Sequence, residues 1–235
     1  MKQKSISLAI KSVLGYLVKK MKVIVYLLVA ILALTSSIVS AYDPSPLQDF
    51  CVAANETNGL FVNGKLCKDP KLVKAEDFYK HTEPVKPNNP LGVALTQVSV
   101  EQLPGLNTMG VSLVRIDYAA KGINPPHTHP RATEILYVLE GVIYAGFVTS
   151  AEDGNRLFTK TLYKGDVFIF PFGLLHFNMN VGTTPAASLA IFSSQNPGTT
   201  NIPDAVFKSN PQLSTDILAK AFQVDNKVID ELRKN

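Results

Sequence analysis

Short β-rich runs follow one another between residues 91 and 193, and this succession constrains the fold more than any other feature of the chain. Valine, isoleucine, leucine and aromatic residues dominate the runs, and turn-forming residues separate them. The runs span residues 93–100, 110–118, 134–139, 142–149, 156–163, 167–170, 175–181 and 187–192. Many short strands at a spacing of roughly ten residues are typical of an antiparallel sandwich or barrel, so we expect an all-β domain.

Beyond residue 203 the pattern becomes helical in three short segments, at residues 204–207, 217–222 and 225–233. Ser214 stands where an N-cap would precede the second segment. Four apolar residues of that segment are expected on one face: Ile217, Leu218, Ala221 and Phe222. The tail is too small to form a domain, so its apolar faces must be buried against the barrel or another subunit. We expect one domain over residues 42–235, with the barrel at about 91–193 and the helical tail at about 203–233.

The first 41 residues have the pattern of a secretory signal. An apolar run of 12 residues, Val23–Leu34, follows three lysines and precedes the small-residue end Val39-x-Ala41. This order is typical of a signal peptide cleaved near Ala41–Tyr42. The run is shorter than the roughly 20 apolar residues of a membrane-spanning helix, so we expect no membrane span after processing. Met21-Lys22 would itself make a normal start, which leaves the first residue open between Met1 and Met21.

The charge of the chain is unevenly distributed. The whole sequence has 23 Lys and Arg against 19 Asp and Glu, a formal net charge of +4. Residues 1–41, however, contain six of the cations and none of the acids, so the other 194 residues have a net charge of −2. A mildly acidic chain without a Lys/Arg cluster predicts no nucleic-acid partner.

Cys51 and Cys67 are the two cysteines of the chain, with 15 residues between them. In an oxidising compartment such a pair most simply forms one disulfide, and two free buried thiols are the alternative. The loop between them contains Asn55-Glu56-Thr57, the single N-x-T sequon of the sequence. In a secreted protein this sequon predicts a glycan on Asn55.

Three of the four histidines belong to one pattern with a carboxylate. His127 and His129 lie two residues apart, so an extended segment places both imidazoles on one face. Glu134 follows five residues later, and His176 comes from a later β-rich run. Imidazole and carboxylate together suit Mn, Fe, Zn, Cu or Ni, so the ligand types alone do not select the metal. Open positions on a six-coordinate metal would favour a reactive site over a closed structural one. The alternative is a set of ordinary turn and core polar residues.

Two glycine-bounded blocks contain these four residues. The first reads Gly122-(four residues)-His127-x-His129-(four)-Glu134-(six)-Gly141. The second reads Gly165-(five)-Pro171-x-Gly173-(two)-His176-(three)-Asn180. The blocks, with 23 residues between them, strongly resemble the two signature motifs of the cupin superfamily. The one departure is the first glycine, which stands one residue nearer than in the usual consensus.

Longer segments resemble the plant germins and germin-like proteins, over essentially the whole chain from Tyr42. They are residues 104–110 (PGLNTMG), 124–134 (NPPHTHPRATE), 165–168 (GDVF) and 217–222 (ILAKAF), with Asp49–Val52 and Cys67. The resemblance implies a cupin jelly-roll β-barrel with a short N-terminal segment and C-terminal α-helices. It also implies secretion to the extracellular space (the apoplast and plant cell wall) and homohexamers built as trimers of dimers. One Mn2+ per chain would be held by His127, His129, Glu134 and His176.

The resemblance leaves the activity open, because germin relatives divide into oxalate oxidases, manganese superoxide dismutases and proteins without established enzyme activity, several linked to defence. It implies two asparagines that hold oxalate. One matches Asn124, although an asparagine before a turn is also ordinary, and the other position is occupied by Val114. Losing one hydrogen bond to a charged group costs about 1.5–3 kcal/mol, which counts against oxalate oxidation. We therefore expect a small anionic substrate, superoxide in preference to oxalate, with a non-enzymatic extracellular binding or receptor protein as the alternative.

Overall fold

The computed structural model describes residues 19–28, 48–54, 61–62 and 65–234. The chain divides into two compact units, residues 1–49 and 50–235, and each is described by itself. In the first unit, residues 19–28 are helical, and the predicted cleavage site near Ala41 lies outside the described residues. Among the described residues, no helix has both the length and the apolar character that crossing a membrane requires.

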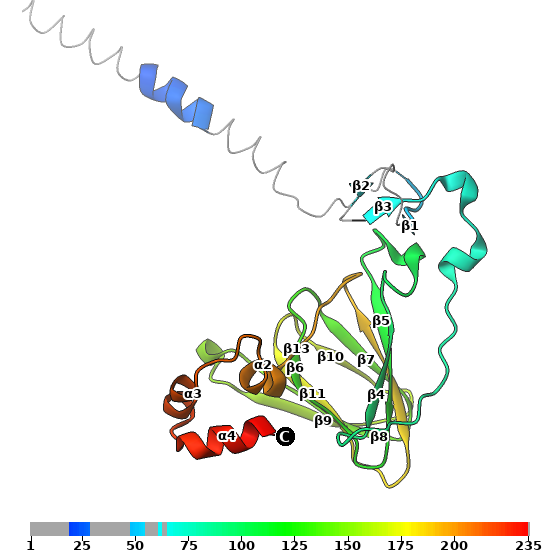
Figure 1. The fold of residues 1–235 in the computed structure, drawn as a ribbon. Helices are drawn as coiled ribbons and strands as arrows, with labels where there is room; N and C mark the ends of the chain where they lie inside the picture. Colours follow the sequence, from blue (N-terminus) through cyan, green and yellow to red (C-terminus); the bar gives the residue numbers. More distant parts are fainter. Residues whose placement is uncertain (1–18, 29–47, 55–60, 63–64, 235) are drawn as a thin grey trace, which may run out of the picture. The chain divides into compact units, whose positions relative to one another are not determined.

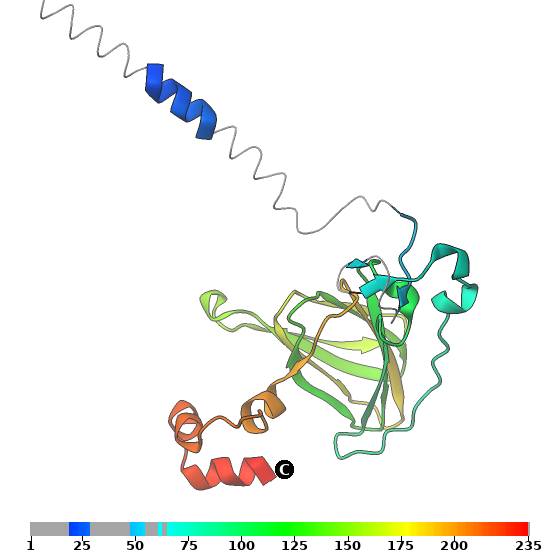
Figure 2. The ribbon, with the colours of Figure 1, turned by 45° about the horizontal axis from the view of Figure 1, so that its top comes forward.

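The second unit is built on two five-stranded antiparallel sheets that face each other as a barrel (Figures 1 and 2). Sheet I has the order β10 (Val167–Phe170), β7 (Glu134–Glu140), β12 (Ala186–Phe192), β5 (Ser112–Tyr118) and β4 (Val93–Val98). Sheet II has the order β13 (Thr200–Asn201), β6 (Ile123–Thr128), β11 (Leu175–Asn180), β8 (Val142–Val148) and β9 (Leu157–Tyr163). Apart from the hairpins β4–β5 and β8–β9, neighbours in sequence lie in opposite sheets, and this order confirms the predicted jelly roll.

Alternation along the strands fills the space between the sheets with apolar side chains. In β7, Leu136 and Val138 are fully buried, whereas Ile135 and Tyr137 between them point outward. The core of the barrel combines residues from both sheets, among them Ile116, Tyr118, Leu136, Val138, Ile143, Leu162, Phe170 and Phe192. Gly141 alone joins β7 to β8: its φ is +82°, and a Cβ there would lie 2.4 Å from the Ala186 Cβ. Only glycine fits this turn.

Strand β6 is absent from the strands that the sequence predicts, because Pro125 and Pro126 lie in its middle. Proline donates no backbone hydrogen bond, so it argues against a strand with neighbours on both sides. Here β13 pairs only with His127 and Thr128, and the pairing of β6 with β11 is interrupted at the two prolines. Strand β6 therefore tolerates the two prolines, because they lie where no backbone N–H is needed for pairing with β11.

The tail contains three short helices, α2 (Ile202–Phe207), α3 (Thr215–Phe222) and α4 (Asn226–Lys234), which confirms the helical prediction. Ser214 caps α3, its side chain accepting a hydrogen bond of 3.2 Å from the Ile217 N–H. The buried face of α3 differs from the predicted one, because Leu218 and Ala219 pack with Ile229 of α4 into a small separate core. Figures 1 and 2 show α3 and α4 standing away from the barrel.

A small sheet of order β1-β3-β2 opens the second unit, built from β1 (Ala53–Ala54), β2 (Phe61–Val62) and β3 (Lys65–Cys67). Cys51 and Cys67 form a disulfide, as predicted, and Cys51 Sγ accepts a hydrogen bond of 3.2 Å from Asn107 Nδ2. The described part of the unit also contains four short 3-10 helices, at Pro70–Leu72, Ala75–Phe78, Pro104–Leu106 and Ala151–Asp153. The sequon residue Asn55 lies outside the described residues.

Replacing both cysteines by alanine should lower the free energy of unfolding by about 3 kcal/mol, because the unfolded chain regains the entropy of an open loop. Urea denaturation of the chain beginning at Tyr42 measures this difference. Reduction of the unchanged protein should give the same loss. Equal unfolding midpoints for the oxidised protein and the double variant would contradict the prediction.

Candidate metal centre

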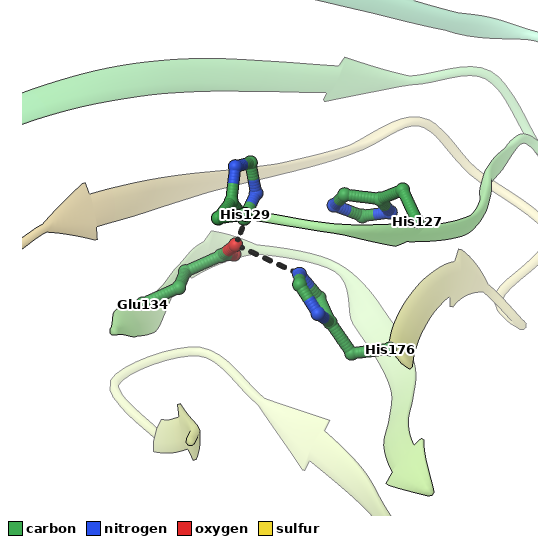
Figure 3. A group of neighbouring side chains, drawn as sticks. All are labelled: His127, His129, Glu134 and His176. Atoms are coloured by element: carbon green, nitrogen blue, oxygen red, sulfur yellow. Dashed lines mark hydrogen bonds and ion pairs between the residues drawn. The ribbon is translucent and has the colours of Figure 1, made fainter. Parts of the chain in front are cut away.

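Three imidazoles and one carboxylate converge inside the barrel (Figure 3). Their ligand atoms all lie within 4.8 Å of one another, and all four residues are buried. They are the predicted set His127, His129, Glu134 and His176. Among the described residues this is the one group of three or more His, Cys, Asp or Glu side chains with the spacing of a metal site.

The two sheets contribute to this group from opposite sides. His127 in β6 and His176 in β11 are direct partners across neighbouring strands of sheet II, and His129 follows the end of β6. Glu134 begins β7 in sheet I, where it lies between Phe170 of β10 and Phe192 of β12. A cation bound by all four side chains would therefore link the two halves of the barrel.

A bulge in β6 brings Asn124 to the same side as the histidines. Along β11 one residue separates His176 from Asn178, but the facing β6 residues His127 and Asn124 have two prolines between them. The extra residue shifts the alternation of β6, so two side chains three positions apart both face inward. Without the bulge, Asn124 and His127 would point to opposite faces of the sheet.

Backbone carbonyls hold each imidazole by its Nδ1 atom. His127 Nδ1 lies 2.7 Å from the Pro125 carbonyl oxygen, His129 Nδ1 lies 2.5 Å from that of Gly198, and His176 Nδ1 lies 2.8 Å from that of Leu174. A carbonyl accepts but never donates, so each neutral ring must carry its proton on Nδ1. All three Nε2 atoms are then free lone pairs, the form that binds metals.

The Nε2 lone pairs face a carboxylate at short range. Glu134 Oε2 lies 3.0 Å from His129 Nε2 and 3.1 Å from His176 Nε2. His129 Nε2 and Glu134 Oε1 are buried without a hydrogen-bond partner among the described residues. Acceptor atoms gathered this closely, away from water, are stabilised by a cation between them. The donor set therefore fits a metal ion of the kind that takes imidazole and carboxylate ligands.

The environment also keeps two of the ligands in the protonation state that a metal needs. Burial, reinforced by repulsion from His176, lowers the pKa of His127 to about 4, so its ring is neutral at pH 7. Burial by itself would raise the pKa of Glu134. The imidazoles of His129 and His176 outweigh that effect and hold the pKa of Glu134 at about 2. The site therefore holds a neutral His127 imidazole and an ionised Glu134 carboxylate at pH 7.

A cavity of about 220 Å³ adjoins three of the four ligands. His127, His129 and Glu134 line it together with Asn124, and Val114 of β5 lines its wall. Among the described residues, the Asn124 amide makes no hydrogen bond with a protein group and is available to a ligand. Both positions that the resemblance links to oxalate therefore lie on this cavity, one as an amide and the other as an aliphatic side chain.

Comparison with known proteins agrees with this architecture. Residues 79–230 match the cupin family. Germin-like protein subfamily 1 member 7 of Arabidopsis thaliana is 61% identical over 204 residues, which cover 86% of this chain and 89% of the relative. Member 13 of the same Arabidopsis thaliana subfamily is 57% identical over 209 residues, covering 88% and 94%. The chain belongs to the germin-like proteins of the cupin family.

Solved structures similar to this germin-like chain include an oxalate oxidase in complex with glycolate. That structure has a TM-score of 0.77 and 41% sequence identity, and the match covers 82% of this chain and 96% of the other. Peruvianin-I, described as a cysteine peptidase from Thevetia peruviana latex, has a TM-score of 0.62 and 39% identity, and the match covers 68% of this chain and 98% of the other. The germin-like fold is thus shared by proteins with different described activities.

The loop after β12 contributes a contact to the germin-like site that the sequence does not reveal. Arg131 binds this loop through Nε to the Asn196 carbonyl oxygen at 2.8 Å, and its backbone N–H donates to the Pro197 carbonyl oxygen at 3.1 Å. The next residue, Gly198, supplies the carbonyl for His129. A Cβ on Gly198 would lie 2.8 Å from Arg131 Nη2, and its φ is +65°. A backbone acceptor carries no side-chain signal, so residue patterns alone miss it.

Gly198→Ala should weaken metal binding by about 10- to 100-fold, because it displaces the carbonyl that orients His129. Arg131→Met should act in the same direction through the same loop. Competition with a chromophoric chelator measures the affinity, and Arg156→Met, at an exposed arginine of the β8–β9 loop, is the matched control. Unchanged affinity in both loop variants would show that the loop does not position the ligand.

The metal-free protein should lose stability as the pH falls from 6.5 to 4. The folded pKa of His127 is about 4, below the ordinary 6.5, so the unfolded chain binds this proton at a higher pH than the folded protein does. Between pH 6.5 and 4 this difference lowers the free energy of unfolding by about 3 kcal/mol. Glu134, with a folded pKa of about 2 against 4.5, adds a second loss only between pH 4.5 and 2. Urea denaturation at a series of pH values measures the loss. In His127→Gln the free energy of unfolding should fall less steeply between pH 6.5 and 4.

His81→Gln is the control for the pH series, because His81 is an exposed histidine outside the ligand group. This variant should keep the slope of the unchanged protein. If the free energy of unfolding depends on pH equally in His127→Gln and the unchanged protein, the loss between pH 6.5 and 4 belongs to other groups.

Proposed function

We propose that this germin-like protein binds Mn2+ at His127, His129, Glu134 and His176 and has a manganese-dependent superoxide dismutase-type activity. The observation that carries the proposal is the convergence of three oriented Nε2 atoms and one carboxylate beside a cavity. A bound manganese ion would supply one-electron redox chemistry between its +2 and +3 states. Three neutral imidazoles and one carboxylate leave a divalent cation with a net positive local charge, which attracts a small anion.

Asn124 has the role of a substrate contact in this proposal. Its amide lies on the cavity with the ligands and is not used by other groups of the described chain. An amide N–H there can donate to an anion without adding a charge or a titrating group. Backbone carbonyls hold the rings of the three histidines in place. In this proposal the protein orients the metal ligands and admits a small anion to the cavity.

Oxalate oxidation is the second candidate, because similar solved structures are oxalate oxidases. Val114 disfavours it. Strand register places Val114 beside Ala190 of β12 and Gln97 of β4, so an aliphatic side chain occupies the wall where a second amide would be needed. A cysteine peptidase, as Peruvianin-I is described, needs a free thiol as nucleophile. Both cysteines of this sequence form the disulfide, which disfavours such an activity here.

A non-enzymatic extracellular binding or receptor protein is the remaining alternative, with the metal as a structural link between the sheets. We also propose secretion to the apoplast or cell wall through residues 1–41, a glycan on Asn55 and a role in defence. The signal pattern, the disulfide and the sequon support secretion and the glycan, and the resemblance to germin relatives linked to defence supports the last proposal.

Exposed apolar surfaces support assembly into a homo-oligomer, which we propose to be a hexamer. The outer face of sheet I exposes Ile135, Tyr137, Val167, Ile169 and Ile191, and the tail exposes Ile217, Phe222, Val228 and Leu232. Apolar surface on this scale is typical of contacts between chains.

Superoxide dismutation by the purified secreted protein should scale with its manganese content. His176→Ala removes one ligand, and activity should fall to that of the metal-free protein, whereas His81→Ala should leave it unchanged. The xanthine oxidase–cytochrome c assay measures the rate, with manganese determined in the same sample. A fully manganese-loaded protein without dismutation would overturn the dismutase proposal and favour the binding role, with oxalate turnover measured next.

A further inference from the structure

We propose that the cavity beside His127, His129 and Glu134 binds an organic monocarboxylate with a short, uncharged, apolar body. The carboxylate would lie toward Asn124 and the ligand group, and the body against the wall that contains Val114. This inference rests on the proposed metal function, because it assigns a ligand class to the same site.

The size of the cavity exceeds what a diatomic anion needs. A site requires roughly 10–15 Å³ of such volume to hold one water molecule. The cavity has about 220 Å³, which accommodates an organic molecule of several heavy atoms. Superoxide alone would leave most of this space to water.

Strand register makes the wall of the cavity apolar in two adjacent rows. In one row, Val114 of β5 lies beside Ala190 of β12. In the next, Ile116 of β5 lies beside Leu95 of the edge strand β4. Phe192 lies two residues beyond Ala190, next to Glu134, and all five apolar side chains line the cavity. An aliphatic chain extending from the ligands would contact this wall directly.

The charges of the cavity restrict the ligand to a single anionic group. The ionisable residues that line it are His127, His129 and Glu134, which belong to the metal group, and no Lys or Arg lines it within the described chain. Neutral Gln97 lies toward the edge of sheet I, where it can hydrogen-bond a ligand but cannot neutralise a charge. A second carboxylate would therefore be desolvated without a counter-ion.

Titration of the manganese-loaded protein with acetate, propionate, butyrate and oxalate tests the inference by isothermal calorimetry. Each added methylene should lower Kd about fourfold, so butyrate should bind about 15-fold more tightly than acetate. Oxalate should bind more weakly than butyrate. A Kd that does not depend on chain length, or tighter binding of oxalate than of butyrate, would overturn the inference.

Val114→Thr keeps the shape of the side chain but makes the wall polar, so it should reduce the butyrate-to-acetate affinity ratio roughly fivefold. Val85→Thr, at a valine 44% exposed in the segment before β4, should leave the ratio unchanged. An unchanged ratio in Val114→Thr would also overturn the inference.

Manganese content and dismutation are measured on the same samples. Dismutation without chain-length dependence would overturn the ligand class and leave the proposed function standing. Chain-length dependence without dismutation would support the ligand class and overturn the dismutase activity. A protein that retains no manganese would overturn both.

Discussion

The contact between one carboxylate and the Nε2 atoms of the facing sheet is the interaction on which the rest of the site depends. Glu134 is the only ligand from sheet I, and it approaches His129 and His176 across the barrel at 3.0 and 3.1 Å. A cation between the groups makes the contact favourable, because it gives the buried lone pairs of both sheets a common partner. Metal binding and the packing of the two sheets are therefore coupled energetically.

Backbone groups, more than side chains, determine the geometry around that contact. The Pro125, Leu174 and Gly198 carbonyls fix the three rings before any metal arrives, and the β6 bulge adds Asn124 to the same face. Neighbouring rows of sheet I then surround the ligands with aliphatic side chains. One small region thus combines a polar centre with an apolar wall, and this combination distinguishes the cavity from a purely anionic pocket.

Much of this could be predicted from the sequence, because spacing and residue type reveal strands, caps and ligands. Eight strands, the cap at Ser214 and the convergence of three histidines with Glu134 follow from such patterns. Strand β6 could not, since Pro125 and Pro126 contradict the usual rule and the gap in the ladder that permits them is a tertiary feature. The contact of the Gly198 carbonyl with His129 could not be predicted either. Every residue has a carbonyl, so the sequence does not indicate which one contacts a ligand. The buried face of α3 is set by its packing against α4, and the spacing of apolar residues within α3 alone does not contain that information.

The two prolines of β6 have one further consequence, which concerns how the chain behaves among other chains. The site lies near a strand whose outer edge is paired only at His127 and Thr128. An open edge of this kind normally recruits foreign strands and seeds aggregation. Neither Pro125 nor Pro126 can donate a backbone hydrogen bond to an incoming strand, so this stretch of β6 is a poor template for strand addition. The prolines at the β6 bulge thereby also disfavour edge-to-edge association with other chains.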